Sequence, residues 1–111
     1  MRKRNDAILS YLGLARKAGK LSTGFEASKE ACLKHKAKFI AVASDISEKS
    51  EKEIRYFSGG KIPVQRIPYT IIDVSAKIGI KAGIVAVCDE GFAEALVKTI
   101  DRSKEEFTHA D

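Results

Sequence analysis

The sequence predicts a three-layer α/β/α sandwich, in which helices cover both faces of a small sheet that is mostly parallel or mixed. Segments with helical spacing of apolar residues alternate with short apolar runs along the 111 residues. The runs within residues 38–44 and 84–88 are continuously apolar, as expected for central strands that are buried on both faces. Because no linker or repeat interrupts the alternation, residues 1–111 are expected to form a single domain.

The first helix is expected over residues 5–17, capped by Asn5 or Asp6 and ended by the glycine at position 19. Its apolar face recurs every three or four residues and consists of Ile8, Leu9, Leu12 and Ala15. Residues 21–23 can form only a short strand.

A second helix is expected from Gly24 to about Lys36. Its buried stripe is modest and comprises Phe25, Ala31 and Cys32, to which Ser28 can be added. Lys34 and Lys36 would interact favourably with the negative end of this helix dipole.

The central strand within residues 38–44 leads into a turn at 45–47, and a third helix follows over residues 48–57. Ile54 and Phe57 anchor this otherwise charged helix, and the sequence Ser-Gly-Gly at 58–60 ends it. Residues 62–66 are expected to form a short strand, and the proline at position 63 indicates a strand start or a sheet edge.

Residues 70–73 have the form of a capping box and are expected to open a short helix that ends near Ile78. A flexible loop at 79–83 precedes the second apolar strand at 84–88. Asp89 caps the last helix, which is expected to run to about Arg102. The apolar face of this helix consists of Phe92, Leu96 and Ile100. The polar residues 103–111 are expected to fray.

Positive charge is concentrated in the first third of the chain. The net charge of +5 divides into +7 for residues 1–38, with ten Lys or Arg and three Asp or Glu, and −2 for the remainder. This asymmetry favours a polyanionic partner, and a solvated basic face explains the composition about equally well. Two cysteines make no disulfide framework, and no apolar run suits a signal peptide or a membrane span. We therefore expect a cytoplasmic protein without membrane association.

The start of the second helix has the properties of an anion site. Gly24 allows a sharp turn and a close approach to the backbone, and the first helical turn presents free N–H groups. Arg16, Lys17 and Lys20 lie shortly before it in the sequence. Backbone donors with nearby cations suit a phosphate backbone better than a small neutral substrate. Phe25 could stack on a base there, and core packing is about as plausible for it.

Enzymatic and metal-binding interpretations are weaker. Residues 13–20 do not fit a P-loop, since five residues rather than four separate the two glycines and Leu21 replaces the Ser or Thr. Cys32 and His35 have a ligand-like spacing, but a structural zinc normally needs four ligands. Cys88 has no histidine near it in the sequence. The sequence therefore predicts no enzyme, no metal site and no cofactor.

The order of these elements resembles the L7Ae family (L7Ae/L30e/S12e/Gadd45 type) of ribosomal and kink-turn RNA-binding proteins, and within it the small bacterial YlxQ-like branch. The resemblance covers residues 6–100. The resemblance rests on five segments of the sequence. They are Leu-Gly-Leu-Ala-Arg-Lys-Ala-Gly-Lys at 12–20, Gly24, Ala-Lys-Phe-Ile-Ala-Val-Ala-Ser-Asp at 37–45, Ile78-Gly79, and Val-Ala-Val-Cys-Asp-Glu-Gly-Phe-Ala at 85–93.

The resemblance implies a four-stranded sheet between helices, with RNA bound across one end of the sheet. The partner would be ribosomal or other structured, kink-turn-like non-coding RNA, and the protein a non-enzymatic, ribosome-associated or RNA-bound component. The implied contacts belong to the helix start, the central turn and the loop before the last strand: Gly24, Phe25, Glu26, Ala27 and Glu30; Ser44, Asp45 and Ile46; and Ile78, Gly79, Ile80 and Lys81. Arg16, Lys17, Lys20 and Lys29 would flank them as cations.

The helix start departs from the family pattern. Kink-turn binders carry Gly-x-Asn-Glu-x-x-Lys there, whereas residues 24–30 read Gly-Phe-Glu-Ala-Ser-Lys-Glu. Glu26 thus replaces the amide, Ala27 the acid and Glu30 the lysine, while Lys29 can supply part of the lost charge from about 100° around the helix. A carboxylate repels phosphate but can accept a hydrogen bond from a base amino group. A protein-interaction module on the same fold, without kink-turn specificity, is therefore the alternative.

Overall fold

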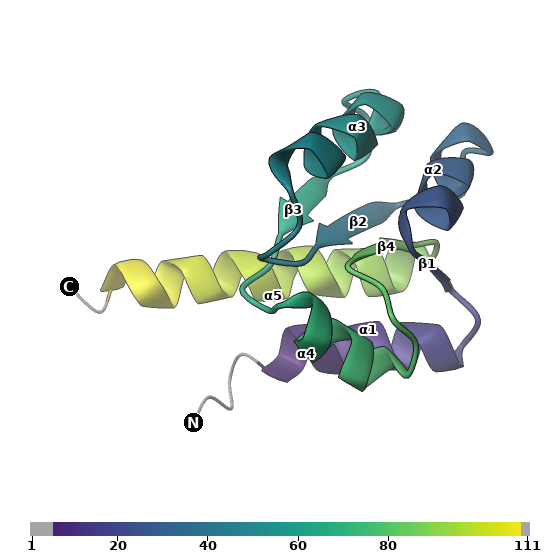
Figure 1. Ribbon diagram of the computed structural model, residues 1–111. Coiled ribbons are helices and arrows are strands. Elements are labelled where there is room, and N and C mark those ends of the chain that lie inside the picture. Colours follow the sequence, from purple (N-terminus) through teal and green to yellow (C-terminus); the bar gives the residue numbers. More distant parts are fainter. Residues whose placement is uncertain (1–5, 110–111) are drawn as a thin grey trace.

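The computed structural model describes the backbone of residues 6–109 and the side chains of residues 7–102. Five helices and four strands alternate, as Figure 1 shows: α1 (Asp6–Lys17), β1 (Leu21–Thr23), α2 (Phe25–Leu33), β2 (Phe39–Val42), α3 (Glu48–Ser58), β3 (Val64–Arg66), α4 (Ile71–Ile78), β4 (Ile84–Val87) and α5 (Glu90–His109). Every predicted helix and strand is present. The predicted cap of α1 at Asn5 or Asp6 lies outside the described side chains.

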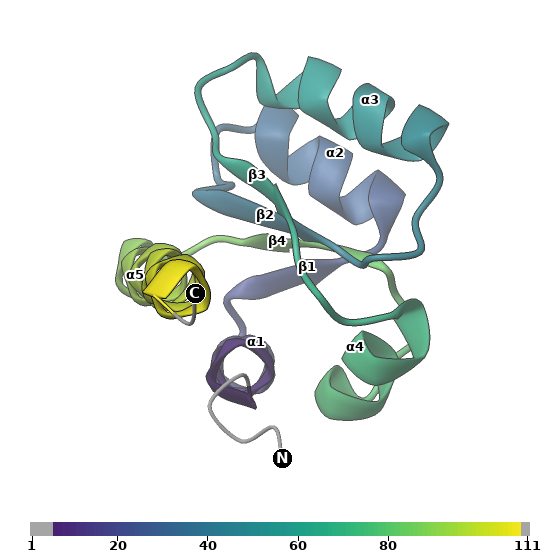
Figure 2. The same ribbon diagram turned by 90° about the vertical axis from the view of Figure 1, so that its left-hand side faces the viewer.

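The four strands form one mixed sheet in the order β1-β4-β2-β3. β2 and β3 are parallel, whereas β4 is antiparallel to both of its neighbours. Helices α2 and α3 cover one face of the sheet, and α1, α4 and α5 cover the other (Figure 2). The structure therefore confirms the predicted three-layer sandwich, with a four-stranded mixed sheet.

The two central strands divide their side chains between two hydrophobic cores. Phe39 and Ala41 of β2, with Val85 and Val87 of β4, pack against α1, α4 and α5. The alternate residues of these strands pack against α2 and α3, and these are Ile40, Val42, Ile84 and Ala86. All eight residues are buried, which explains why the two strands are continuously apolar in the sequence.

The second helix ends at Leu33, about three residues earlier than predicted. The turn is closed by hydrogen bonds from the His35 amide to the Cys32 carbonyl (3.0 Å) and from the Lys36 amide to the Ala31 carbonyl (2.8 Å). His35 takes the left-handed backbone conformation that this closure requires, with φ 61°. The prediction that Lys34 and Lys36 lie in the last helical turn was therefore wrong, because both residues come after Leu33.

The last helix continues to His109, seven residues past its predicted end. Residues 103–109 contain neither glycine nor proline and include the good helix formers Lys and Glu, so the backbone continues without a break where the sequence predicted a frayed tail. No helix among the described residues is both long enough and apolar enough to cross a bilayer.

Candidate functional site

Two of the segments predicted to form a site, the start of α2 and the turn after β2, meet at one end of the sheet, where the chain of the third segment enters β4. β1 and β2 both run antiparallel to β4, so that Thr23 pairs with Val85 and Val42 pairs with Ile84. The residues that follow β1 and β2 therefore lie beside those that precede β4. The Gly24 amide donates to the Ile84 carbonyl (2.7 Å), and the next hydrogen bond joins the Ala43 amide to the Gly83 carbonyl (2.7 Å).

Helix α2 starts at this end of the sheet without a side-chain cap. Its N-cap residue is Gly24, with φ 99° and ψ 164°, a conformation that is essentially restricted to glycine. By contrast, side-chain oxygens of Ser47, Thr70 and Asp89 accept hydrogen bonds from the first-turn amides of α3, α4 and α5. The start of α2 therefore has no side-chain cap, unlike the starts of these three helices.

The turn after β2 is fixed by an arginine that sequence reasoning did not identify. Nη1 of Arg66, at the end of β3, donates to the carbonyl oxygens of Ala43 (3.2 Å) and Ser44 (2.7 Å). Its Nε and Nη2 donate to Oε1 of Glu51 in α3, and Arg55 donates to Oε2 of the same carboxylate. The hydrogen bonds from Arg55 and then Arg66 lower the pKa of Glu51 below its ordinary value. The sequence offered no local signal for this network because Arg66 and Glu51 are fifteen residues apart.

Asp45 and Ile46 connect the same turn to α4 and β4. Oδ1 of Asp45 accepts a hydrogen bond from the Ile71 amide (2.9 Å), so its carboxylate helps to cap α4. The side chains of Ile46 and Ile71 lie against Gly83, where a Cβ atom would be only 2.7 Å from each of them. The turn is therefore packed directly onto the residue that precedes β4.

The third predicted segment is the loop between α4 and β4, and it presents one apolar side chain. Ile80 is 42% exposed, whereas the side chain of Ile78 is buried in the core. Gly79 ends α4 with φ 82°, and Arg16 from α1 donates from Nη1 to the Ile78 carbonyl (2.5 Å). Arg16 thus stabilises the C-terminal end of α4, where a cation is favourable.

A basic groove of about 420 Å³ separates α1 from α4 and leads to this loop. Its cations are the predicted Arg16 and Lys17, together with Lys77, which was not predicted. The remaining lining residues are Ser10, Gly13, Leu14 and Ile78. Lys77 directly precedes Ile78 and is exposed, and this adjacency to the predicted loop was the signal that could have identified it.

The structure places three predicted charged residues in other surroundings. Lys20 lies at the opposite end of β1 from Gly24, where its carbonyl accepts from the Cys88 amide (2.8 Å). The ammonium of Lys29 lies 4.9 Å from the centre of the Phe57 ring and thus faces α3. Glu30 forms an ion pair with Lys34 (2.9 Å), which lowers the pKa of its carboxyl group.

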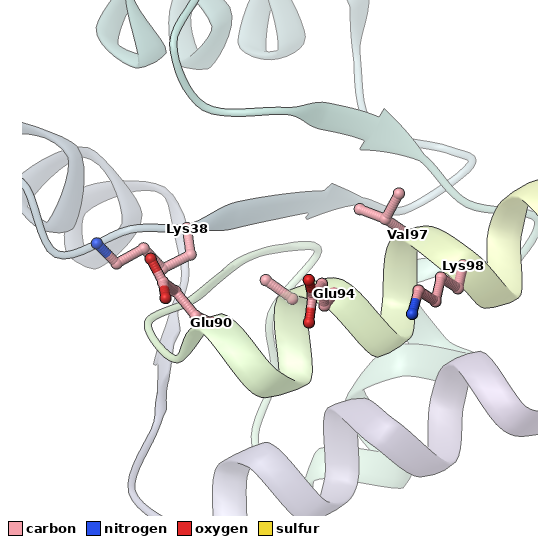
Figure 3. A pocket seen from close by; sticks show the side chains of 6 residues that line it. Lys38, Glu90, Glu94, Val97 and Lys98 are labelled. Atoms are coloured by element: carbon pink, nitrogen blue, oxygen red, sulfur yellow. The ribbon is translucent and has the colours of Figure 1, made fainter.

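A separate hollow of about 490 Å³ lies between α5 and the start of β2. Figure 3 shows Lys38 and Glu90 at one end of it and Lys98 at the other. Two lysines and two glutamates balance its charge, and Ala93 and Val97 complete the lining. This arrangement offers neither a nucleophile with a base nor a concentration of one charge.

The cysteines and histidines of the described region form no metal centre. No group of three or more His, Cys, Asp or Glu in that region is arranged to hold a metal ion. Cys32 is a buried free thiol in the core beneath α2, and burial raises its pKa. Cys88 is half-buried, 3.8 Å from the Ser22 hydroxyl.

Comparison with known proteins identifies relatives across most of the chain. A profile of the ribosomal protein L7Ae/L30e/S12e/Gadd45 family matches residues 6–97. The RNA-binding protein YlxQ of Enterococcus faecium is 30% identical over 94 residues, which cover 84% of this chain and 90% of that protein. The RNA-binding protein YlxQ of Bacillus subtilis (strain 168) is 28% identical over 95 residues, or 81% and 91% of the two chains.

Two solved structures share the fold. A protein of unknown function from Bacillus halodurans C superposes with a TM-score of 0.79 at 29% identity, covering 85% of this chain and 96% of that one. The Giardia lamblia 15.5kD RNA binding protein superposes with a TM-score of 0.70, covering 95% and 92% of the two chains. At 8% identity, this second similarity shows the fold alone.

Proposed function

Since the chain belongs to the ribosomal protein L7Ae/L30e/S12e/Gadd45 family, we propose that it is a non-enzymatic RNA-binding protein that docks structured RNA on one end of its sheet. The docking surface comprises the start of α2 at Gly24–Ala27, the turn at Ser44–Ile46 and the loop at Gly79–Lys81, and is called the sheet-end site below. Its partner is ribosomal or another non-coding RNA with a kink-turn-like bend. Two relatives are named as RNA-binding proteins and not as enzymes, which supports the proposal.

The observation that carries the proposal is the uncapped start of α2 beside a rigid turn. Free backbone amides at a helix N-terminus bind phosphate oxygens, and Gly24 leaves no Cβ to hold a phosphate away. The neighbouring turn is held by Arg66 and Asp45 through hydrogen bonds to the backbone. The site therefore does not need to be ordered by its ligand, which lowers the entropic cost of binding.

Each remaining part of the sheet-end site has a corresponding contact in RNA recognition. Arg16, Lys17, Lys77 and Lys81 are exposed cations near the α4–β4 loop and provide attraction for phosphates. Ile80 presents an apolar side chain that can cover an unstacked base. Glu26 is exposed in the first turn of α2 and can accept a hydrogen bond from a base amino group.

The Glu30 carboxylate repels phosphate less than its sequence position suggests. Its exposed ion pair with Lys34, one helical turn away, partly compensates its charge. Among the three departures from the kink-turn pattern, this leaves Glu26 as the one unpaired acid at the described helix start.

The direct test is binding of the purified protein to a kink-turn RNA and to a plain duplex of equal length, over a series of salt concentrations. The proposal predicts tighter binding to the kink-turn and a steep loss of affinity with salt, because each phosphate contact releases counterions. Lys77→Ala should weaken binding several-fold and reduce the salt slope by about 1. Lys52→Ala on the exposed side of α3 is the matched control and should leave both unchanged.

The outcomes separate the proposal from its alternatives. Equal, salt-sensitive binding to both RNAs would retain RNA binding and refute kink-turn preference. No binding to either RNA would favour a protein-interaction module on the same fold. Lys20→Ala adds a test of location, since a loss as large as that for Lys77→Ala would move the RNA toward the opposite end of β1. Co-sedimentation with ribosomes tests the ribosomal partner.

A further inference from the structure

A second groove lies at the opposite end of the sheet from the proposed RNA site. Helices α2 and α3 lie side by side, and their C-terminal ends are on the same side of the molecule (Figure 2). The groove occupies about 600 Å³, within the range of clefts that bind small ligands and peptide side chains. It is lined by the last residues of the two helices and by the segments that follow them, including Leu33, His35, Lys38, Phe57, Lys61 and Ile62.

The groove combines an apolar floor with a basic rim. Cys32, Ala37, Phe57 and Ile62 are buried or half-buried, whereas Leu33 is 58% exposed at its edge. The titratable side chains of the lining other than Cys32 are His35, Lys38 and Lys61, and none is a carboxylate. The exposed Lys36 adjoins them in the sequence.

Nearby acids do not cancel this charge fully. Glu30, the nearest acid before the groove on α2, already pairs with Lys34. Lys38 also lines the hollow on the α5 side, which it shares with Glu90. Lys61, by contrast, lines only this groove among the hollows described above. The sequence run of Lys34, His35, Lys36 and Lys38 therefore has a structural setting that RNA binding at the sheet-end site does not use.

The aromatic ring in the groove favours a peptide over a nucleic acid as the occupant. Base stacking requires a free ring face. The ammonium of Lys29 lies over the Phe57 ring, 4.9 Å from its centre, and Tyr56 packs against the same ring with centroids 5.3 Å apart and planes at 81°. Phe57 thus already has two partners within the protein, whereas the exposed Leu33 and the half-buried Ile62 can receive an aliphatic or aromatic side chain.

We propose that the groove between the C-terminal ends of α2 and α3 is a docking site for an acidic segment of a partner protein. The segment inserts an apolar side chain against Leu33 and Ile62 and places its carboxylates beside Lys61 and Lys38. Since this groove and the sheet-end site lie at opposite ends of β2, one molecule of the protein can hold RNA and this partner together.

The test is a selection of random twelve-residue peptides on the purified full chain, followed by affinity measurement for the enriched peptides. We expect peptides rich in Asp and Glu around a bulky apolar residue. Leu33→Ala removes apolar contact area and Lys61→Glu replaces attraction by repulsion, so each should weaken their binding at least about fivefold. Amide chemical-shift changes should centre on residues 32–38 and 57–62.

The matched controls are Ile72→Ala and Lys52→Glu, which alter an exposed apolar residue and an exposed lysine outside the groove. Both should retain peptide affinity within about twofold of the wild type. Far-ultraviolet circular dichroism verifies that each variant is folded.

Four results would overturn the proposal: no enriched peptide, enriched peptides without acidic residues, unchanged affinity in Leu33→Ala and Lys61→Glu, or an equal loss in the controls. Loss of kink-turn RNA binding in Lys61→Glu would assign the groove to RNA instead. Concentration-dependent dimerisation that Leu33→Ala abolishes would assign it to a second copy of the chain.

Discussion

Replacement of Gly83 by alanine tests the contact that joins the turn, α4 and β4. An added Cβ atom would lie 2.7 Å from Cδ1 of Ile46, 2.7 Å from Cγ1 of Ile71 and 3.3 Å from Cγ1 of Ile46. Gly83 does not have the positive φ that disfavours alanine, so the effect is steric. One of the two closest atoms is the far end of a side chain, whereas Cγ1 of Ile71 lies nearer its backbone and can move less freely.

The magnitude follows from two opposing terms. Overpacking by one methyl group in a filled region destabilises by about 1–3 kcal/mol. Alanine also restricts the unfolded chain and thereby contributes about 0.4–1 kcal/mol to stability. The net prediction for Gly83→Ala is a loss of about 1–2 kcal/mol in the free energy of unfolding, measured by urea denaturation.

A double-mutant cycle identifies the cause of the loss. Ile46→Val removes Cδ1 and alone should cost about 0.5–1 kcal/mol, because Ile46 is only half-buried. Combined with Gly83→Ala it relieves one of the two 2.7 Å contacts, so the double variant should be more stable than the sum of the single effects by about 1 kcal/mol.

The control is Gly13→Ala in α1, where the added Cβ would meet nothing closer than 3.6 Å. Helix propensity predicts that this variant is more stable by about 0.5–1 kcal/mol. If Gly83→Ala matched Gly13→Ala in being neutral or stabilising, the close packing of Ile46 and Ile71 on Gly83 would be refuted. Additive behaviour in the cycle would refute the role of Ile46.

Three further predictions concern stability. Ser28→Ala should stabilise the protein by about 1 kcal/mol in urea denaturation, because the Ser28 hydroxyl is fully buried and has no partner among the described residues; a loss would indicate a partner. His35→Gly should raise stability by about 1 kcal/mol, because glycine adopts a φ of 61° without strain, and an unchanged thermal midpoint would contradict this strain. The pKa of Glu51 is lower in the folded protein than its unfolded value near 4.5, so its ionised form contributes stability above pH 4.5 that is lost as the pH falls through the folded pKa. Glu51→Gln should therefore flatten the pH dependence of the free energy of unfolding below about pH 4.5. An unaltered profile would argue against the network.

The fold could be predicted because local signals and burial agreed along the chain. The runs in β2 and β4 are apolar on both faces because helices cover both faces of the sheet. The capping box at Thr70 and Asp73 is present as predicted, with both of its hydrogen bonds. The end of α2 was missed because glycine is the usual signal for a left-handed closure, and His35 takes that conformation here.

The candidate site was only partly predictable, because its support comes from residues distant in the sequence. Arg66 reaches the turn across twenty-two residues, and the Asp45 carboxylate reaches the start of α4 across twenty-six. No spacing rule within a helix or strand reports such contacts. The direction of a side chain could likewise not be predicted from the sequence. Lys29 lies close to the predicted site in the sequence, yet its ammonium group lies over the Phe57 ring.

The contacts that hold the sheet-end site also explain how its recognition residues can differ from those of kink-turn binders. Gly24 is tied to Ile84 through the backbone, and the turn at Ser44 is held by Arg66. None of these contacts uses the side chains at positions 26, 27 and 30, which are exposed or half-buried on α2. Under the proposed function, substitution at those three positions is expected to alter which bases and phosphates are favoured while the geometry of the helix start stays the same. The residues that hold the helix start and the turn are thus distinct from the residues that we propose to contact RNA.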